Sequence, residues 1–354
     1  MTPVAPVVAS GDATAGYRGA VAAVRYGDES SEWEALDSGA GLFEVPWRAT
    51  IVVGGGERAR FLHGQLSNHI EALGPGRGCP ALLLSAQGKV VSLLSVYHRG
   101  PNFLLVVDAE RARTTREALA SRLVADDVEL GPVLGGRCLG LAGPRARVVL
   151  GEAGFDCGRP GGWWVESVSF AGTRVELFSR ADLRVPCFEI HAPSAQIAMA
   201  VGRRLQEKGA RWVGTAALEI VRIESGTPAY GLEFDEDRLA LEARLEWAIH
   251  PDKGCYLGQE VVERTMSRGR VNRRLCLLGA DGKLEPGDRL KGGGETERVT
   301  SAARSPGLGY IGLAYLPCSL EVRGTKVAFA GAAASVVEAV ALEWPRDVRA
   351  RQPA

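Results

Sequence analysis

The sequence predicts an α+β protein that ends in a small all-β domain, and two observations carry this prediction. Up to Arg274, strand patterns stand beside helical patterns without the regular strand–helix–strand alternation of a parallel α/β sheet. Beyond Arg274, short apolar runs are separated by Gly-rich turns, which is typical of a small β domain. The length of 354 residues, at roughly 150 residues per domain, favours two or three domains.

Strand and helix patterns follow one another along the first half of the chain. The apolar run 50–53 ends at three glycines, and a helix is expected to begin at residue 57. Three further strands are expected at 81–84, 90–97 and 103–107. An Ala- and Leu-rich helix is expected at 108–124. The Gly- and Pro-rich stretch 131–162 is expected to cross a boundary between lobes.

The second half contains one clear strand, two helices and the terminal β domain. Residues 174–178 alternate apolar and polar side chains, and helices are expected at 193–209 and 215–225, the latter with Gly226 in the C-cap position. The terminal strands are expected at 275–278, 298–302, 310–315 and 325–329. Residues 345–354 are expected to form a frayed tail.

Composition and charge exclude several classes of protein. The 42 Lys and Arg residues balance the 42 Asp and Glu residues, so the totals do not suggest global binding to a polyanion. A hydrophobic content of 46% with 24% charged residues argues against disorder. The chain has no apolar run long enough to span a membrane, and its first ten residues resemble neither a signal nor a transit peptide. A cytoplasmic protein without a membrane partner is therefore expected.

Cysteine and histidine spacing predicts free thiols and no stably bound metal. The seven cysteines contain no CxxC pair, and the five histidines show no metal-binding spacing. Residues 307–312 match G-x-G-x-x-G, but the surrounding β-type pattern favours a turn over a dinucleotide site. The sequence has no P-loop and no G-x-S-x-G motif.

The octapeptide Lys-Gly-Cys-Tyr-Leu-Gly-Gln-Glu, residues 253–260, is the most informative segment. Lys253 can stabilise a thiolate at Cys255, and the neighbouring glycines allow a backbone or ligand to approach closely. Glu260 begins a predicted helix in which it can reach Arg264. A buried free cysteine in a turn explains the same residues, and the chemistry alone leaves both interpretations open.

Positive charge gathers around this segment. Between Lys253 and Arg274 there are six Lys or Arg and two Glu, a local charge of +4. Such a patch suits an anionic ligand, a nucleic acid or an acidic partner, and equally a solvated basic face. Upstream, Arg222 and Glu224 end a helix before a Gly/Pro turn, where they can line a cleft or form an ordinary salt bridge.

Together, RIESGTPAYGLEF and KGCYLGQEVVERTMSRGRVNRRL resemble the YgfZ branch of the glycine-cleavage T-protein superfamily, whose signature is K-G-C-[FY]-x-G-Q-E. Weaker similarity extends to residues 61–68, 85–90 and 307–315. The resemblance implies a T-protein-like ring of two α+β lobes followed by a small C-terminal β-barrel. The implied domains are an N-terminal folate-binding lobe at 1–130, a second lobe carrying the signature at 131–272, and the barrel at 273–354.

The resemblance also implies a function, namely a tetrahydrofolate-binding accessory protein for the assembly or repair of iron–sulfur clusters. Its partners would be iron–sulfur assembly or client proteins, including tRNA-modifying enzymes, with Cys255 as the functional thiol. The residues implied to bind tetrahydrofolate or a derivative are Arg222, Lys253, Gly254, Tyr256, Gly258, Gln259 and Glu260.

The chain departs from the T-protein pattern where catalysis would occur. The acidic pair of the T-protein has no counterpart in residues 88–93, and its Y-T-G-E element survives only as a tail in residues 181–190. Ordinary aminomethyl transfer then lacks its general base. Three alternatives stay open: a folate-dependent aminomethyltransferase or demethylase using Glu224 or Glu233, tRNA contact through residues 264–274, and a scaffold with an empty pocket.

Overall fold

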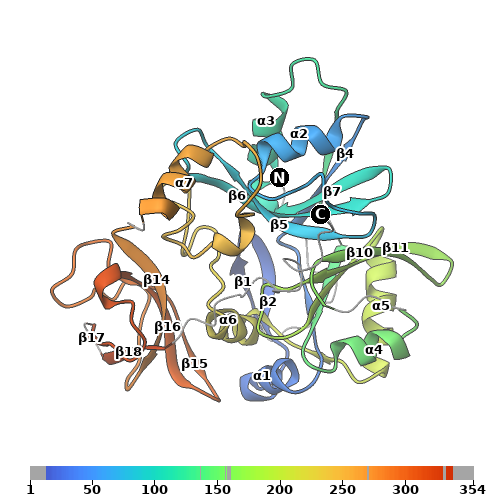
Figure 1. Cartoon of the computed structure of the whole chain (residues 1–354). Helices are drawn as coiled ribbons and strands as arrows, with labels where there is room; N and C mark the ends of the chain where they lie inside the picture. The colour runs from blue at the N-terminus through green and yellow to red at the C-terminus, as the bar shows by residue number, and fades with distance from the viewer. Residues whose placement is uncertain are drawn as a thin grey trace.

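A computed structural model describes residues 13–135, 137–155, 157, 161–268, 271–329 and 332–337. The predicted tail at 345–354 lies outside this part of the chain. Figure 1 shows three groups of strands arranged around a central hairpin and helix, with the C-terminal group set to one side. No helix of the described residues is long and apolar enough to cross a membrane.

The first sheet is antiparallel and has five strands in the order β5-β6-β7-β4-β8. Helices α2 and α3 pack against it around a core that includes Ile51, Leu62, Leu105 and Leu119, all with no exposed surface. The bounds of these elements are β4 Arg48–Gly54, α2 Arg58–Gln65, β5 Gly78–Leu84, β6 Val90–Arg99, β7 Asn102–Asp108, α3 Ala109–Ala120 and β8 Glu129–Gly135.

The second sheet has six strands in the order β10-β11-β12-β9-β3-β13, with α4 and α5 beside it (Figure 1). Strand β3 (Gly41–Glu44) comes from early in the chain and pairs antiparallel with β9 (Arg137–Ala142). The other bounds are α4 Ala146–Glu152, β10 Trp164–Phe170, β11 Thr173–Arg180, β12 Cys187–Ala192, α5 Ala195–Glu207 and β13 Arg211–Trp212.

A separate two-stranded hairpin and two helices lie between the sheets. Strands β1 (Ala13–Tyr17) and β2 (Ala20–Arg25) pair only with each other among the described strands. Buried alanines of β2 share a core with α1 (Glu29–Asp37) and α6 (Thr215–Glu224). Helix α6 ends at Gly226, whose φ of +66° suits a residue without a Cβ.

The C-terminal strands form an antiparallel sheet in the order β15-β16-β14-β18-β17. Their bounds are β14 Arg273–Ala280, β15 Val299–Ser305, β16 Gly309–Pro317, β17 Lys326–Ala328 and β18 Ala333–Val337. The all-β prediction is confirmed for the described residues of this region. Since β15 and β17 are edge strands of this sheet, closure into a barrel stays a prediction.

The strong sequence patterns are confirmed at nearly their expected places. The expected helix at 193–209 is α5, and the expected strand at 90–97 lies within β6. Residues 306–308 form the turn between β15 and β16, and the rest of the G-x-G-x-x-G match lies in β16. The Gly- and Pro-rich stretch 131–162 contains turns and also two regular elements, β9 and α4, which its composition does not predict. The chain passes there from the first sheet at β8 to the second at β9, whereas the exact domain boundaries stay predictions.

Replacing Gly140 with alanine is expected to lower the free energy of unfolding by about 1–3 kcal/mol. The new Cβ would lie 2.1 Å from the buried ring of Phe43, which faces Gly140 across the β3–β9 pair. Urea denaturation of both proteins measures the difference. The matched control is Gly151→Ala in α4, where no atom lies within 4 Å and stability should rise slightly. Equal stability of Gly140→Ala and the unmodified protein would contradict the packing argument.

Candidate functional site

A central pocket lies where the hairpin tip meets both large sheets. Its volume is about 80 Å³, and residues from widely separated parts of the chain line it. Aromatic side chains form part of the wall, with Trp163 and Trp247 stacked at 6.3 Å between ring centroids and an interplanar angle of 13°. The sequence pattern did not single out these tryptophans, because they are distant in the chain and meet only in the folded protein.

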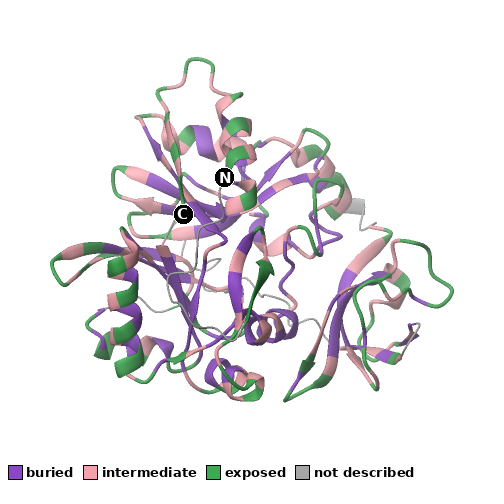
Figure 2. Ribbon diagram, turned by 180° about the vertical axis from the view of Figure 1, so that it is seen from behind, coloured by how far each residue is buried: buried purple, intermediate pink, exposed green. Residues whose placement is uncertain are grey.

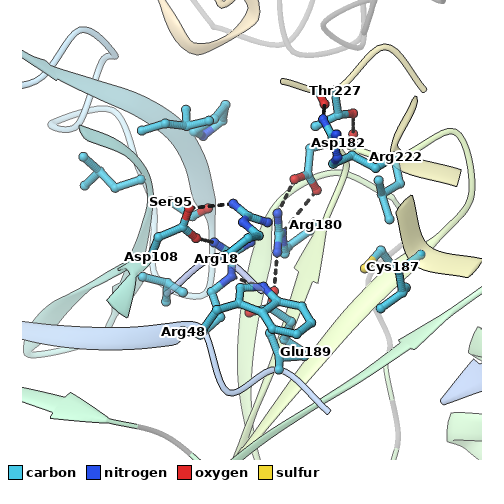
Figure 3. A pocket seen from close by; sticks show the side chains of 18 of the residues that line it. Arg18, Arg48, Ser95, Asp108, Arg180, Asp182, Cys187, Glu189, Arg222 and Thr227 are labelled. Atoms are coloured by element: carbon cyan, nitrogen blue, oxygen red, sulfur yellow. Dashed lines mark hydrogen bonds and ion pairs between the residues drawn. The ribbon is translucent and has the colours of Figure 1, made fainter. Parts of the chain in front are cut away.

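Six buried or half-buried charges cross the pocket as an alternating chain of cations and anions, shown in Figure 3. The members, in order of contact, are Arg18, Asp108, Arg48, Glu189, Arg180 and Asp182. Arg18 Nη2 lies 2.5 Å from Asp108 Oδ2, and Arg48 Nε lies 3.2 Å from Glu189 Oε1. We refer to these six side chains as the ion chain.

The ion chain keeps its buried carboxylates ionised. Burial alone would raise the pKa of Asp108, but Arg18 and Arg48 hold that pKa below its usual value. Burial opposes ionisation of Glu189 too, yet Arg180 and Arg48 hold its pKa well below the ordinary range. Both carboxylates are therefore hydrogen-bond acceptors at neutral pH.

Arg222 is the one predicted site residue that lines the pocket, and its donors are already used. It is 5% exposed and makes five hydrogen bonds of 2.7–2.9 Å, to both carboxylate oxygens of Glu219, Thr227 O, Glu233 Oε2 and Ser301 Oγ. A guanidinium has five N–H donors, so a ligand would have to displace one of these partners. The geometry favours a role for Arg222 in joining α6 to β15.

Glu224 and Glu233, the carboxylates considered as replacement acids, are buried outside the pocket lining. Glu224 accepts hydrogen bonds from Trp33, Arg184 and Ser305. Glu233 accepts hydrogen bonds from Arg222, Ser301 and the Ala229 amide. Neither carboxylate is placed to act on a ligand in the pocket, where the lining acids are instead Asp108, Asp182 and Glu189.

The signature segment lies away from the pocket lining. Lys253 is 5% exposed, and its ammonium donates to the carbonyls of His63 and Leu66, thereby capping the C-terminal end of α2. Burial lowers the pKa of Lys253 to about 8. The ammonium also lies 4.8 Å from the centroid of the Tyr256 ring.

The other signature residues shape the surface around an exposed thiol. Cys255 and Gly254 are exposed, Tyr256 is buried, and α7 (Gln259–Arg268) begins at Gln259 as the sequence predicts, with Glu260 exposed. Among the described cysteines Cys255 alone is fully exposed. The assignment of Lys253, Gly254, Tyr256, Gly258, Gln259 and Glu260 to folate binding stays a prediction.

Three of the five histidines gather beside the signature, which their spacing in sequence did not indicate. The ring centroids of His63 and His69 are 4.6 Å apart, and those of His69 and His250 are 5.5 Å apart. Backbone amides donate to Nδ1 of His69 and of His250. In the neutral tautomer the remaining nitrogen of each ring then carries hydrogen, which does not favour metal ligation.

Several cations of the predicted basic patch are already paired. Lys253 is buried against carbonyl groups, Arg273 pairs with Glu242, and Arg274 pairs with Glu246 and Glu321. Arg270 lies outside the described residues. Tertiary pairing therefore reduces the charge that was counted along the sequence, and tRNA contact through residues 264–274 stays a prediction.

Three potential metal ligands, Cys138, Glu189 and His191, lie with their donor atoms within 4.8 Å of one another. Glu189 already binds Arg48 and Arg180, and burial raises the pKa of the Cys138 thiol well above its usual value. A cation would meet two guanidinium groups there, so the donor set does not favour a metal.

The fold and pocket define a protein with two sheets joined around a charged cavity and a further C-terminal sheet. A family model described as the GCVT N-terminal domain matches residues 19–253. The chain is 31% identical over 306 residues to an aminomethyltransferase of Rubrobacter xylanophilus, covering 84% of this chain and 82% of that protein. The chain therefore belongs to the GCVT family.

Two further comparisons agree with this assignment. A chloroplastic protein of Arabidopsis thaliana, named only as a transferase, is 28% identical over 298 residues, 82% of this chain and 68% of its own length. The crystal structure of the glycine cleavage system aminomethyltransferase T from Bartonella henselae superposes with a TM-score of 0.83. At 22% identity, covering 94% of this chain and 95% of the other, this likeness shows a shared fold.

Replacing Gly258 with alanine is expected to lower the free energy of unfolding by about 2 kcal/mol or more. Gly258 has a φ of +84°, and a Cβ there would lie 2.6 Å from the Ser85 carbonyl oxygen in the turn between β5 and β6. The control is Gly254→Ala in the same signature, where no atom lies within 4 Å. Urea denaturation that shows the same loss for both variants would contradict this explanation.

Replacing Arg48 with methionine is expected to lower the free energy of unfolding at pH 7 by about 1.5–3 kcal/mol, since Asp108 and Glu189 each lose one of two arginine partners. Asp108 and Glu189 have depressed folded-state pKa values. Their stabilising contribution is therefore present above the unfolded pKa of about 4 and is lost as the pH falls through the folded values.

The difference between Arg48→Met and the unmodified protein should consequently shrink below about pH 4, as both carboxylates become protonated. Urea titrations monitored by circular dichroism at a series of pH values measure it. Arg25→Met, which removes an exposed pair with Glu29, is the control and should change stability little at any pH. A pH-independent loss in Arg48→Met would show that packing, rather than the ion chain, causes the effect.

Proposed function

We propose that the protein is a tetrahydrofolate-binding member of the YgfZ branch that supports iron–sulfur cluster assembly or repair in client enzymes, including tRNA-modifying ones. Cys255 is its functional thiol, acting at a surface separate from the folate pocket. The signature octapeptide supports the YgfZ branch, and membership of the GCVT family supports a folate ligand. A cytoplasmic location remains part of this proposal.

The donor and acceptor groups of the pocket suit a folate. Trp163 and Trp247 offer flat apolar surfaces to a pteridine ring. The carboxylate of Glu189 can accept hydrogen bonds from pteridine N–H groups. When bound, tetrahydrofolate supplies a carrier for one-carbon units.

The observation that carries the proposal is that, among the described residues lining the pocket, every carboxylate is paired with an arginine. Leu93 lines the wall in the segment where the T-protein has acids, while the buried Ser92 hydroxyl lies 2.5 Å from Thr115 Oγ1. The lining carboxylates of Asp108, Asp182 and Glu189 are all paired with arginines. A carboxylate held ionised by guanidinium groups is a weak base, so the pocket favours binding over aminomethyl transfer.

Cys255 is assigned the role of functional thiol because Cys187, the cysteine in the pocket lining, is unreactive. Cys187 lines the pocket, and burial raises the pKa of its thiol to about 12, so it remains protonated at neutral pH. Cys255 is exposed and can meet a partner. One thiolate does not hold an iron–sulfur cluster alone, so a client protein or small thiol completes the ligand set.

A folate-dependent aminomethyltransferase or demethylase is the second candidate, favoured by the names of the relatives. It would need one of the paired carboxylates in the pocket to lose its arginine partner when substrate enters. Folate-dependent turnover of an aminomethyl donor or an N-methyl amine by the purified protein would support this candidate over a binding function.

Tetrahydrofolate binding and the thiol function should be separable by mutation. We expect Trp163→Ala to weaken tetrahydrofolate binding at least tenfold, since a stacking surface is lost, and Cys255→Ser to leave it unchanged. Anaerobic titration calorimetry measures both, with Trp163→Phe as the control that retains an aromatic ring. In a deletion strain, Cys255→Ser should fold normally but fail to restore the activity of iron–sulfur enzymes.

Two outcomes would contradict the proposal. Absence of binding at millimolar tetrahydrofolate would remove the folate function. Full restoration of iron–sulfur enzyme activity by Cys255→Ser would remove the thiol function.

A further inference from the structure

The enclosed part of the central pocket is narrow. Its volume is about 80 Å³, whereas pockets for drug-sized ligands occupy roughly 300–1,000 Å³. A pteridine with its p-aminobenzoyl-glutamate tail gains room there when part of the lining moves.

The tip of the β1–β2 hairpin occupies part of the pocket. Tyr17 and Arg18 at this tip both belong to the lining. The Tyr17 hydroxyl donates to Glu219 Oε1 at 2.5 Å, and Arg18 pairs with Asp108, as Figure 3 shows for the arginine. These two contacts fasten the tip to α6 and to the end of β7.

The hairpin is attached to the protein on one side only. Strand β1 pairs with β2 and with no other described strand, and its residues Ala13 to Gly16 are exposed (Figure 2). Strand β2 provides the attachment, because Ala20 and Ala22 are buried against α6. The tip and β1 can therefore move without disrupting either large sheet.

Two features make the closed position of the tip unfavourable in itself. Arg18 has a φ of +48°, a left-handed conformation that costs free energy in a residue with a Cβ. Its Nε is buried without a hydrogen-bond partner. Both costs are removed when the tip leaves this position or when a ligand acceptor reaches Nε.

Withdrawal of Arg18 leaves no unpaired buried charge behind. Asp108 also pairs with Arg48, which lies on β4 and does not belong to the hairpin. Each carboxylate of the ion chain therefore keeps an arginine partner while the tip moves, although three carboxylates then share two arginines. Opening breaks the Arg18 and Tyr17 contacts, including the packing of the Tyr17 ring against Trp47.

We propose that the β1–β2 hairpin is a gate for the central pocket, latched by Arg18 on Asp108 and by Tyr17 on Glu219, and displaced when a folate enters. This inference rests on the proposed folate function and adds to it the element that controls access. Binding then proceeds at a rate that depends on how often the latch opens.

A disulfide that locks the hairpin provides the test. A Cβ at Gly19 would lie 3.0 Å from Cβ of Glu110 on α3, and a shift of the tip by about 0.5–1 Å brings the pair to the separation found in disulfides. Gly19→Cys with Glu110→Cys can therefore join the tip to the protein. Cys255→Ser is the background, because Cys255 is exposed. Mass spectrometry confirms the bond, and circular dichroism confirms folding.

Titration calorimetry with 5-formyltetrahydrofolate, a folate stable in air, compares oxidised and reduced forms. We expect the oxidised protein to bind at least tenfold more weakly, and dithiothreitol to restore binding. The single Gly19→Cys variant controls for strain at that glycine. Equal affinity of the oxidised and reduced forms overturns the gate alone, whereas absence of binding by the unmodified protein overturns the folate function and the gate with it.

The latch has a kinetic test of its own. Arg18→Gln should raise the association rate of 5-formyltetrahydrofolate several-fold in stopped-flow measurements, because the closed position loses its ion pair. Arg25→Gln, at the base of the same hairpin and outside the pocket lining, should leave the rate unchanged. An unchanged or lower rate in Arg18→Gln overturns the assignment of the latch.

Discussion

The ion chain is the interaction on which the centre of this protein depends. It joins the hairpin tip, both large sheets and the pocket wall through alternating guanidinium and carboxylate groups. Since each interior charge contacts a charge of opposite sign on both sides, no member is buried alone, which would cost several kcal/mol. The same pairing gives the pocket a polar lining in which the described carboxylates each contact an arginine.

A second polar network attaches the C-terminal sheet to the pocket. Arg222 and Glu224 on α6 each bind a serine of β15, namely Ser301 and Ser305. Arg222, which the resemblance assigned to folate binding, and Glu224, considered as a replacement acid, thus hold the third sheet against the helix that lines the pocket. The arrangement explains why both side chains are buried with their hydrogen bonds directed to other parts of the protein. The charged groups of the pocket lining that remain as candidate ligand contacts are the arginines and acids of the ion chain.

The signature segment separates two tasks in space. Lys253 caps α2 and Gly258 packs on the turn between β5 and β6, so both residues fix the backbone on either side of Cys255. Cys255 between them is exposed at the surface, away from the pocket lining. Under the proposed function, small-molecule binding and contact with a partner would therefore occur at different sites.

The sequence by itself determined the elements with strong periodicity, such as α5 and β6, the start of α7, and membership of a T-protein-like fold, because these depend on local patterns and a nearly unbroken motif. It left two interpretations of Cys255, a functional thiol and a buried free cysteine, and the buried interpretation is wrong because Cys255 is exposed. Only the tertiary structure decided which charges line the pocket. Arg18 and Asp108 are 90 residues apart in sequence, and Asp108 and Glu189 are 81 apart, so no local pattern could show that folding brings them into one ion chain.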